Sequence, residues 1–234
     1  MTILLINKIN TFYGLSHILF DVSLELQEGE TVCLLGRNGV GKSTTLKSIM
    51  GLVQPQSGSI KFFRREIKSL ATYRISRLGI GYVPENRLIF PDLTVRENLI
   101  IGAKSGDNGQ DWTLEKIYQV FPILKEREAQ DGGTLSGGEQ QMLTIARTLM
   151  GNPKLILLDE PSEGLAPLIM RAVYETVKRL REKSISILLS EQNADFALKL
   201  SNRAYILEKG QISWSGVASE LISTPEITKK YLGV

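Results

Sequence analysis

The sequence predicts an α/β fold with a mainly parallel sheet, an N-terminal antiparallel β portion and an inserted helical subdomain. Short apolar runs rich in Ile, Leu and Val alternate with longer segments of helical periodicity, which is typical of β-α units. The first runs lie close together, and turns such as Gln27–Glu30 separate them, which favours antiparallel pairing there. Between Pro84 and Leu135 only helices and loops are indicated, so this stretch is predicted to be an insertion.

The individual elements follow in chain order from the same patterns. Strands are predicted at Ile3–Ile9, Val22–Leu26, Thr31–Leu35, Ser59–Phe62, Gly79–Val83, Leu155–Leu158, Ile185–Leu189, Ala204–Leu207 and Gln211–Trp214. Helices are predicted at Lys42–Met50, Val95–Ile101, Leu114–Phe121, Gly137–Met150, Pro167–Arg181 and Ala194–Leu200. Thr94 and Glu97 have the spacing of a capping box, Gly51 ends the first helix, and Gly106–Asp111 is predicted to be an exposed loop.

Length and composition favour a single domain inside a cell. The 234 residues fit one domain, 1–234, with the helical subdomain at approximately 86–152. The single cysteine, Cys33, excludes an internal disulfide and fits a reducing cytoplasm. Apolar runs such as Ile3–Ile6 are far shorter than the roughly 20 residues that cross a bilayer, and no signal peptide is indicated. The net charge of +3 is too small to imply a nucleic acid as partner.

A phosphate-binding loop is the strongest motif. It satisfies the pattern G-x-x-x-x-G-K-[ST] and joins a predicted strand to a predicted helix. Its residues are Gly36, Arg37, Asn38, Gly39, Val40, Gly41, Lys42 and Ser43. The glycines let successive backbone amides face phosphates, and the helix adds its positive N-terminal end. Lys42 would reach the β- and γ-phosphates and Ser43 would bind Mg²⁺, so the core is predicted to be that of a P-loop NTPase.

Two carboxylates follow a strand that is predicted to be buried. Leu155–Leu158 leads into Asp159 and Glu160. The end of a strand beside a P-loop is where Asp159 can support Mg²⁺, and Glu160 can orient and polarise the attacking water. The alternative is a surface turn with two exposed acids. A P-loop is common to GTPases, kinases and ATPases, and this acidic pair separates them only in part.

A third motif lies directly before a long predicted helix. It consists of Leu135, Ser136, Gly137, Gly138, Glu139 and Gln140. Ser136 can cap the helix, and the two glycines leave its first amides uncovered, which makes a second anion site at a helix N-terminus. One chain therefore offers two phosphate-binding ends.

Together these motifs resemble the ATP-binding subunit of ABC transporters, and the resemblance covers nearly the whole chain. It implies the ABC ATPase fold and a head-to-tail dimer. Each ATP would lie between Gly36–Thr44 of one subunit and Ser136–Gly138 of the other. Thr44 would thus be part of the nucleotide-binding loop. Tyr13 would occupy the position that stacks on adenine, and the alternative is a core tyrosine near a strand end. The inserted helices would carry the third motif and face the membrane subunits.

The finer resemblance is to the branched-chain amino acid uptake group, within which the chain resembles the smaller of two paired ATPase subunits. It rests on phrases such as Tyr-Val-Pro-Glu at 82–85 and Ser-Glu-Gln-Asn-Ala at 190–194. It implies ATP and Mg²⁺ as cofactors. The implied partners are two membrane permease subunits, a second homologous ATPase subunit in a heterodimer and an extracytoplasmic solute-binding protein, with a homodimer in isolation. The chain would be peripheral, at the cytoplasmic face of the cell membrane.

Three positions depart from the wider family. Glu85 stands where the family has glutamine, Gln192 where it has the switch histidine, and Ala166 where it has an aspartate. Glu85 can bind Mg²⁺ but repels phosphates, Gln192 can donate a hydrogen bond but never becomes cationic, and Ala166 lacks a polar group. We therefore expect ATP hydrolysis at this site to be slower than at a site that has the switch histidine. The catalytic candidates are Glu160, Gln192 and Glu85, and the Mg²⁺ candidates are Ser43, Asp159 and Glu85.

The predicted function is an ATPase that powers the uptake of branched-chain or other amino acids. Related ATPases that serve the transport of urea or short amides share many of these sequence segments, so transport of those solutes is an alternative function. An exporter is a second alternative, because the motor motifs serve both directions. ABC ATPases of translation or DNA maintenance usually carry a second cassette or a long coiled coil, and neither fits in 234 residues. Glu160 argues against a non-catalytic nucleotide-binding regulator.

Overall fold

A computed structural model describes residues 1–104 and 112–223, so the loop predicted at Gly106–Asp111 lies outside the described residues. The strands are β1 (Thr2–Tyr13), β2 (Ser16–Gln27), β3 (Thr31–Leu35), β4 (Ser57–Phe62), β5 (Arg65–Glu66), β6 (Ile80–Val83), β7 (Leu155–Asp159), β8 (Ser186–Glu191), β9 (Arg203–Glu208) and β10 (Gln211–Val217). The helices are α1 (Lys42–Ile49), α2 (Thr72–Arg77), α3 (Val95–Gly102), α4 (Leu114–Val120), α5 (Pro122–Glu126), α6 (Gly137–Met150), α7 (Pro167–Glu182), α8 (Ala194–Leu200) and α9 (Ala218–Ser223), with a 3-10 turn at Gly132–Thr134.

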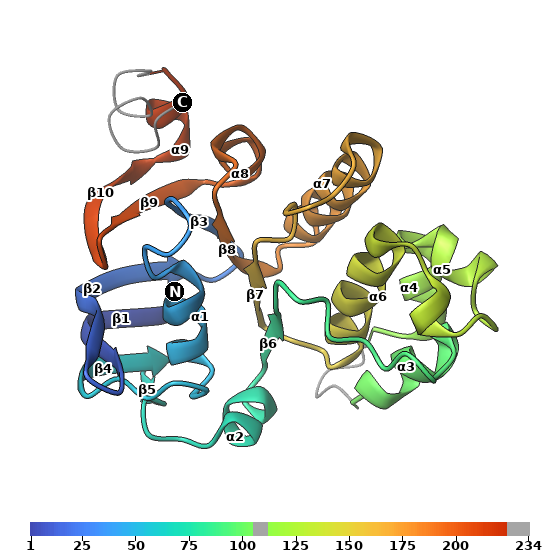
Figure 1. The fold of residues 1–234 in the computed structure, drawn as a ribbon, viewed down its shortest axis with the longest axis horizontal. Helices are drawn as coiled ribbons and strands as arrows, with labels where there is room; N and C mark the ends of the chain where they lie inside the picture. The colour runs from blue at the N-terminus through green and yellow to red at the C-terminus, as the bar shows by residue number, and fades with distance from the viewer. Residues whose placement is uncertain (105–111, 224–234) are drawn as a thin grey trace.

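The strands form two sheets (Figure 1). The first sheet has four antiparallel strands in the order β2-β1-β4-β5. The second has six strands in the order β10-β9-β3-β8-β7-β6, and it is parallel except for β10 at its edge. The predicted fold class, with a mainly parallel sheet and an N-terminal antiparallel portion, is therefore confirmed.

The six-stranded sheet is buried on both faces because alternate residues of its strands enter two different cores. In β7, Ile156 and Leu158 belong to the core that includes α6, α7 and α8, whereas Leu155 and Leu157 belong to the core with α1 and the four-stranded sheet. Burial on both faces explains why this strand reads as an unbroken apolar run. Figure 1 shows α1 next to the four-stranded sheet and α7 and α8 on the other side of the six-stranded sheet.

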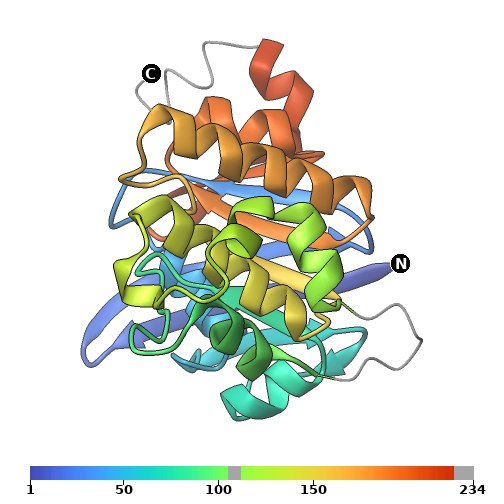
Figure 2. The same cartoon turned by 90° about the vertical axis from the view of Figure 1, so that its right-hand side faces the viewer.

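The insertion between β6 and β7 is helical. Its described residues form α3 to α6 and no strand, apart from one isolated bridge between Thr94 and Asp131. The capping box that the sequence predicts at the start of α3 is confirmed. Thr94 N donates to Glu97 Oε2 at 2.8 Å, and Glu97 N donates to Thr94 Oγ1 at 3.2 Å. Figure 2 shows these helices together in front of the strands. No helix of the described part of the chain is long and apolar enough to cross a membrane.

The first hairpin is longer than the sequence predicts. β1 continues to Tyr13 and β2 begins at Ser16, whereas the predicted strands end at Ile9 and begin at Val22. Gly14, with a φ of +58°, turns the chain between them. Shifts of register along this pair break the alternation by which a strand is recognised. The sequence also misses β5, α2, α5 and α9, which have at most six residues each and are too short to show a period.

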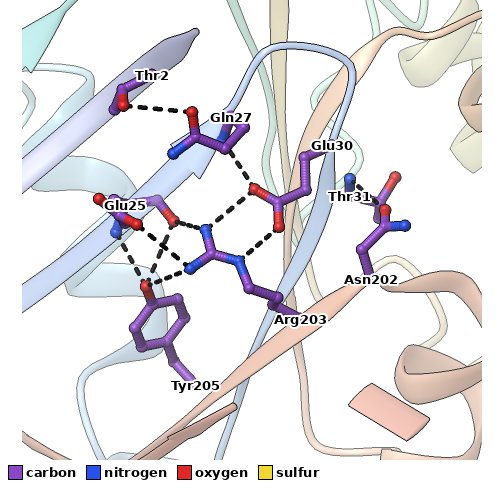
Figure 3. A network of polar contacts seen from close by, with 8 residues as sticks. All are labelled: Thr2, Glu25, Gln27, Glu30, Thr31, Asn202, Arg203 and Tyr205. Carbon is purple, nitrogen blue, oxygen red and sulfur yellow. Dashed lines mark hydrogen bonds and ion pairs between the residues drawn. The ribbon is translucent and has the colours of Figure 1, made fainter. Parts of the chain in front are cut away.

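A charged network joins the two sheets at the turn before β3 (Figure 3). Arg203 on β9 donates through Nε to Glu30 Oε1 at 2.6 Å and through Nη2 to Glu30 Oε2 at 3.0 Å. The same Nη2 donates to the carbonyl oxygen of Glu25 on β2 at 2.9 Å. Glu30 Oε2 also accepts from the backbone N–H of Gln27 at 2.8 Å. Bidentate pairing of this kind is strong and restricts the relative orientation of the two side chains. The network therefore helps to hold the antiparallel sheet against the parallel one.

Candidate nucleotide-binding site

The P-loop joins β3 to α1 at the carboxyl end of the parallel strands. Gly41 immediately precedes α1 with a φ of +110°, and Gly39 has a φ of +80°. L-residues with a side chain rarely adopt such angles, so both positions require glycine. A Cβ on Gly41 would lie 2.6 Å from Leu19 Cδ2, whereas a Cβ on Gly39 would meet no atom within 4 Å. Along the loop Arg37, Asn38 and Gly39 are exposed, Val40 and Ser43 are half-buried, and Gly36, Gly41, Lys42 and Thr44 are buried.

The ammonium group of Lys42 is bound inside the protein. Its Nζ donates to the carbonyl oxygens of Gly36 at 2.7 Å and Arg37 at 2.9 Å, and it pairs with Glu160 Oε1 at 3.1 Å. Both charged side chains are buried. Phosphate oxygens that replaced these three acceptors would leave the ammonium with as many partners as before. The lysine is thus held in place for an anion by groups that an anion can displace.

Glu160 follows β7 in a strained conformation. Its φ of +46° lies in the left-handed region, which costs free energy for a residue with a side chain. Burial raises the pKa of Glu160 to about 7, although the charge of Lys42 lowers it; the charges of Glu163 and Glu191 raise it further. A carboxyl group that titrates near neutrality is suited to accept a proton from water.

Asp159, the last residue of β7, is buried among hydroxyl groups. Its Oδ1 accepts from Ser43 Oγ at 3.0 Å and from Ser190 Oγ at 2.6 Å, and its Oδ2 accepts from Tyr82 Oη at 2.9 Å. Among the described residues, no lysine, arginine or histidine forms an ion pair with Asp159. A buried carboxylate without a protein cation, beside a serine hydroxyl, supplies the hard oxygen donors that Mg²⁺ prefers. The residues present therefore fit this ion.

Two of these hydroxyl groups, on Tyr82 and Ser190, are absent from the sequence-based predictions. Ser190 is the register partner of Asp159 in the parallel β7–β8 pair, and β6 lies on the other side of β7. The carboxyl ends of neighbouring parallel strands meet at one edge, so both residues could be found once the strand order is known. Sequence alone does not give that order. Glu191 is also part of the site, since its carboxylate accepts from Ser162 N at 3.0 Å and Asn193 N at 3.3 Å.

Glu85 and Gln192 are more exposed than Glu160, the third catalytic candidate. Both are exposed, in the loops that follow β6 and β8. Partial burial raises the pKa of Glu85, and the charges of Glu163 and Asp159 add to the increase. The described residues contain no group of three or more His, Cys, Asp or Glu side chains placed to hold a metal ion. Within the described residues, the side-chain hydrogen bonds of Asp159 come from Ser43, Ser190 and Tyr82, and none comes from Gln192.

Tyr13 and Ala166 lie at the ends of elements. Tyr13 is the last residue of β1 and is 45% exposed, so its ring is open to a stacking partner and is not a core residue. Ala166 precedes α7 and provides no side-chain cap to that helix.

The third motif begins α6, as predicted. Ser136 N donates to Glu139 Oε2 at 2.8 Å and Glu139 N donates to Ser136 Oγ at 3.4 Å, which is a capping box. A Cβ on Gly138 would collide with the side chain of Ile169, so this glycine also allows α6 to pack against α7. Leu135 is buried, Ser136 is exposed, and Gln140 donates to the carbonyl oxygen of Gly132. Within the described chain no hydrogen bond or ion pair joins residues 135–140 to residues 36–44.

Comparison with known proteins gives one consistent result. The family model described as ABC transporter matches residues 19–163. The high-affinity branched-chain amino acid transport ATP-binding protein BraG of Pseudomonas aeruginosa is 46% identical over 97% of this chain and 98% of its own length. The probable branched-chain amino acid transport ATP-binding protein LivF of Archaeoglobus fulgidus is 37% identical over 97% of each chain. The crystal structure of the ADP conformation of MJ1267, an ATP-binding cassette of an ABC transporter, superposes with a TM-score of 0.82 at 28% identity and covers both chains completely.

Proposed function

The chain belongs to the family of ABC transporter ATP-binding subunits, and from this premise we propose that it powers the uptake of branched-chain or other amino acids. The chain is an ATPase of this family. The choice of solute is supported by the similarity to the Pseudomonas aeruginosa protein, which extends over almost the whole chain. The observation that carries the mechanism is the contact of Lys42 with Glu160 beside the buried Asp159.

The P-loop residues would bind ATP and hold its phosphates. Lys42 would exchange its carbonyl partners for β- and γ-phosphate oxygens, and Gly36–Thr44 would supply backbone amides. Ser43 and Asp159 would hold Mg²⁺, with Glu85 as a further candidate ligand. Bound Mg²⁺ supplies neutralisation of the charge on the phosphates. Tyr13 would stack on the adenine.

Glu160 would act as the general base toward water. Its carboxylate is paired with Lys42 at 3.1 Å. Phosphates that draw Lys42 away leave the carboxylate free to orient a water molecule and accept its proton. Gln192 follows β8 at the same edge of the sheet and would donate a hydrogen bond to the γ-phosphate after a movement of its loop. Glu160 would therefore become available as a base only after Lys42 has moved from its carboxylate to the phosphates of a bound nucleotide.

A second subunit would complete the site. Residues of the third motif, Leu135, Ser136, Gly137, Gly138, Glu139 and Gln140, lie at the start of α6 and would contact the ATP held by the P-loop of the partner. The helical subdomain, approximately 86–152, would carry this motif and face the membrane subunits. Subunits of this family are peripheral to the membrane and work with permease subunits as dimers. We further assign a second ATPase as heterodimer partner, an extracytoplasmic solute-binding protein and the cytoplasmic face of the membrane as the location.

Uptake by cells that lack this chain tests the assignment. Cells complemented with the wild-type chain should accumulate radiolabelled leucine, isoleucine and valine, whereas cells with Glu160→Gln should not. The matched control is Glu182→Gln, which changes an exposed carboxylate at the end of α7 and should restore uptake. Loss of urea or acetamide uptake with leucine uptake intact would assign the alternative solute. Unchanged uptake of both classes in cells without the chain would contradict the role in import.

A further inference from the structure

We propose that Tyr82 is a positioning residue for Asp159: its hydroxyl holds the carboxylate in the orientation that binds Mg²⁺. The inference rests on the proposed nucleotide site and gives a role to Tyr82, the first residue of the Tyr-Val-Pro-Glu segment, which has none in the sequence-based predictions. Tyr82 lies within β6, beside β7, and donates from Oη to Asp159 Oδ2 at 2.9 Å.

The two oxygens of Asp159 have different partners, and this difference gives Tyr82 its role. Oδ1 accepts from Ser43 and Ser190, whereas within the described residues Tyr82 supplies the one hydrogen bond to Oδ2. When the Ser43 hydroxyl turns to Mg²⁺, Ser190 still holds Oδ1 and Tyr82 still holds Oδ2. One donor on each oxygen prevents the carboxylate from rotating about its Cβ–Cγ bond. Without Tyr82, only one oxygen would be fixed.

The hydroxyl of Tyr82 is a dependable donor. The phenol of an ordinary tyrosine has a pKa of about 10, so the hydroxyl carries its proton at neutral pH. A protonated hydroxyl that donates to a carboxylate forms a charge-assisted bond, which is stronger than a bond between neutral groups.

Tyr82 also borders a cavity beside β6. The cavity has a volume of about 370 Å³, and its lining includes Tyr82, Phe90, Ile101 and Arg147. The strand is held close to α6 here, since a Cβ on Gly81 would lie 2.5 Å from Thr148 Cγ2. Side chains alternate along a strand, so the side chain of Tyr82 lies on the opposite face of β6 from Gly81. There it packs against the core that includes α1 and the four-stranded sheet, while its hydroxyl reaches Asp159.

Calorimetric titration of ADP measures the contribution of Tyr82 without hydrolysis. The affinity is measured with Mg²⁺ and with EDTA, and the ratio of the two is the factor by which Mg²⁺ strengthens binding. Partners of metal ligands typically contribute 10–100-fold to metal affinity, so Tyr82→Phe should lower this factor about tenfold. The affinity in EDTA should stay at the wild-type value, because the P-loop is unchanged.

The control variant is Tyr205→Phe. Tyr205 is also a largely buried tyrosine, and its hydroxyl accepts from Glu25 N at 3.2 Å and donates to Glu25 O at 3.4 Å, away from the nucleotide site. It should leave the Mg²⁺ factor unchanged. A Tyr82→Phe protein with the wild-type factor would overturn the inference, and so would equal loss of affinity with and without Mg²⁺, which would indicate a general structural role. Failure of the nucleotide site itself would look different, since the wild-type chain would then not bind ADP or would bind it equally with and without Mg²⁺.

Discussion

Replacement of Glu160 by glutamine should stabilise the nucleotide-free protein above neutral pH. Burial raises the pKa of Glu160 from its ordinary value of 4.5 to about 7 despite the attraction of Lys42 at 3.1 Å. This difference corresponds to about 3 kcal/mol by which folding disfavours the ionised carboxylate. Glutamine has the same shape and carries no charge, and its side-chain oxygen can still accept from Lys42. The free energy of unfolding should therefore be higher in Glu160→Gln by up to about 3 kcal/mol at pH 8.

The sign of the pH dependence follows from proton binding. Between pH 4.5 and about 7 the folded protein holds a proton on Glu160 that the unfolded chain has released. The contribution of this group to stability therefore decreases as pH rises through this interval, and it is constant above it. The difference between variant and wild type should appear above pH 4.5, grow to about pH 7 and then level off.

Urea denaturation of both proteins without nucleotide at pH 5, 6, 7 and 8 measures this difference. The control is Glu182→Gln, which should differ from wild type by less than about 0.5 kcal/mol at each pH because the side chain is exposed. The competing view is that the ion pair with Lys42 dominates, since breaking a buried pair costs about 3–5 kcal/mol. A Glu160→Gln protein less stable than wild type at pH 8 would support that view and refute the reasoning.

The remaining predictions concern the lysine, the sheet network and the loop after β8. Lys42→Ala should weaken ATP binding and abolish hydrolysis, because several kcal/mol of phosphate charge compensation is lost; ATP affinity and rate at wild-type values would exclude the P-loop assignment. Arg203→Met should lower the free energy of unfolding by about 1–2 kcal/mol in urea, since Arg203 is partly exposed, and an unchanged midpoint would mean that the sheets do not depend on the network. Gln192→Ala should hydrolyse ATP more slowly than wild type, while Gln192→His should preserve the rate or raise it at most about tenfold. An alanine variant with the wild-type rate would remove the sensor role from Gln192.

The sequence predicts the central elements of the fold well because their patterns are local. β3 spans Thr31–Leu35 and α6 spans Gly137–Met150, with the bounds that the apolar run and the Ser136 capping motif predict. The outer strands are predicted less well. The end of β1 and the start of β2 are held by pairing with each other, and β1 also pairs with β4, across shifts of register that no single stretch of sequence reveals.

In the candidate site, too, the contacts that depend on local sequence can be predicted, and those that depend on the tertiary fold cannot. Lys42 and Ser43 lie in one contiguous motif, so their proximity can be inferred from the chain itself. Tyr82 and Ser190 reach Asp159 only because β6 and β8 flank β7, and strand order is a property of the whole fold. The left-handed conformation of Glu160 and its pairing with Lys42 likewise depend on tertiary packing.

The most direct test of the account is the fate of ATP on Glu160→Gln, measured as bound ATP and released phosphate in the same sample. The account predicts that this variant binds ATP and retains it uncleaved, because an amide keeps the shape of the side chain but does not accept a proton from water. Glu182→Gln should release phosphate at the wild-type rate. Phosphate release at the wild-type rate from Glu160→Gln would contradict the claim that Glu160 activates water at this site.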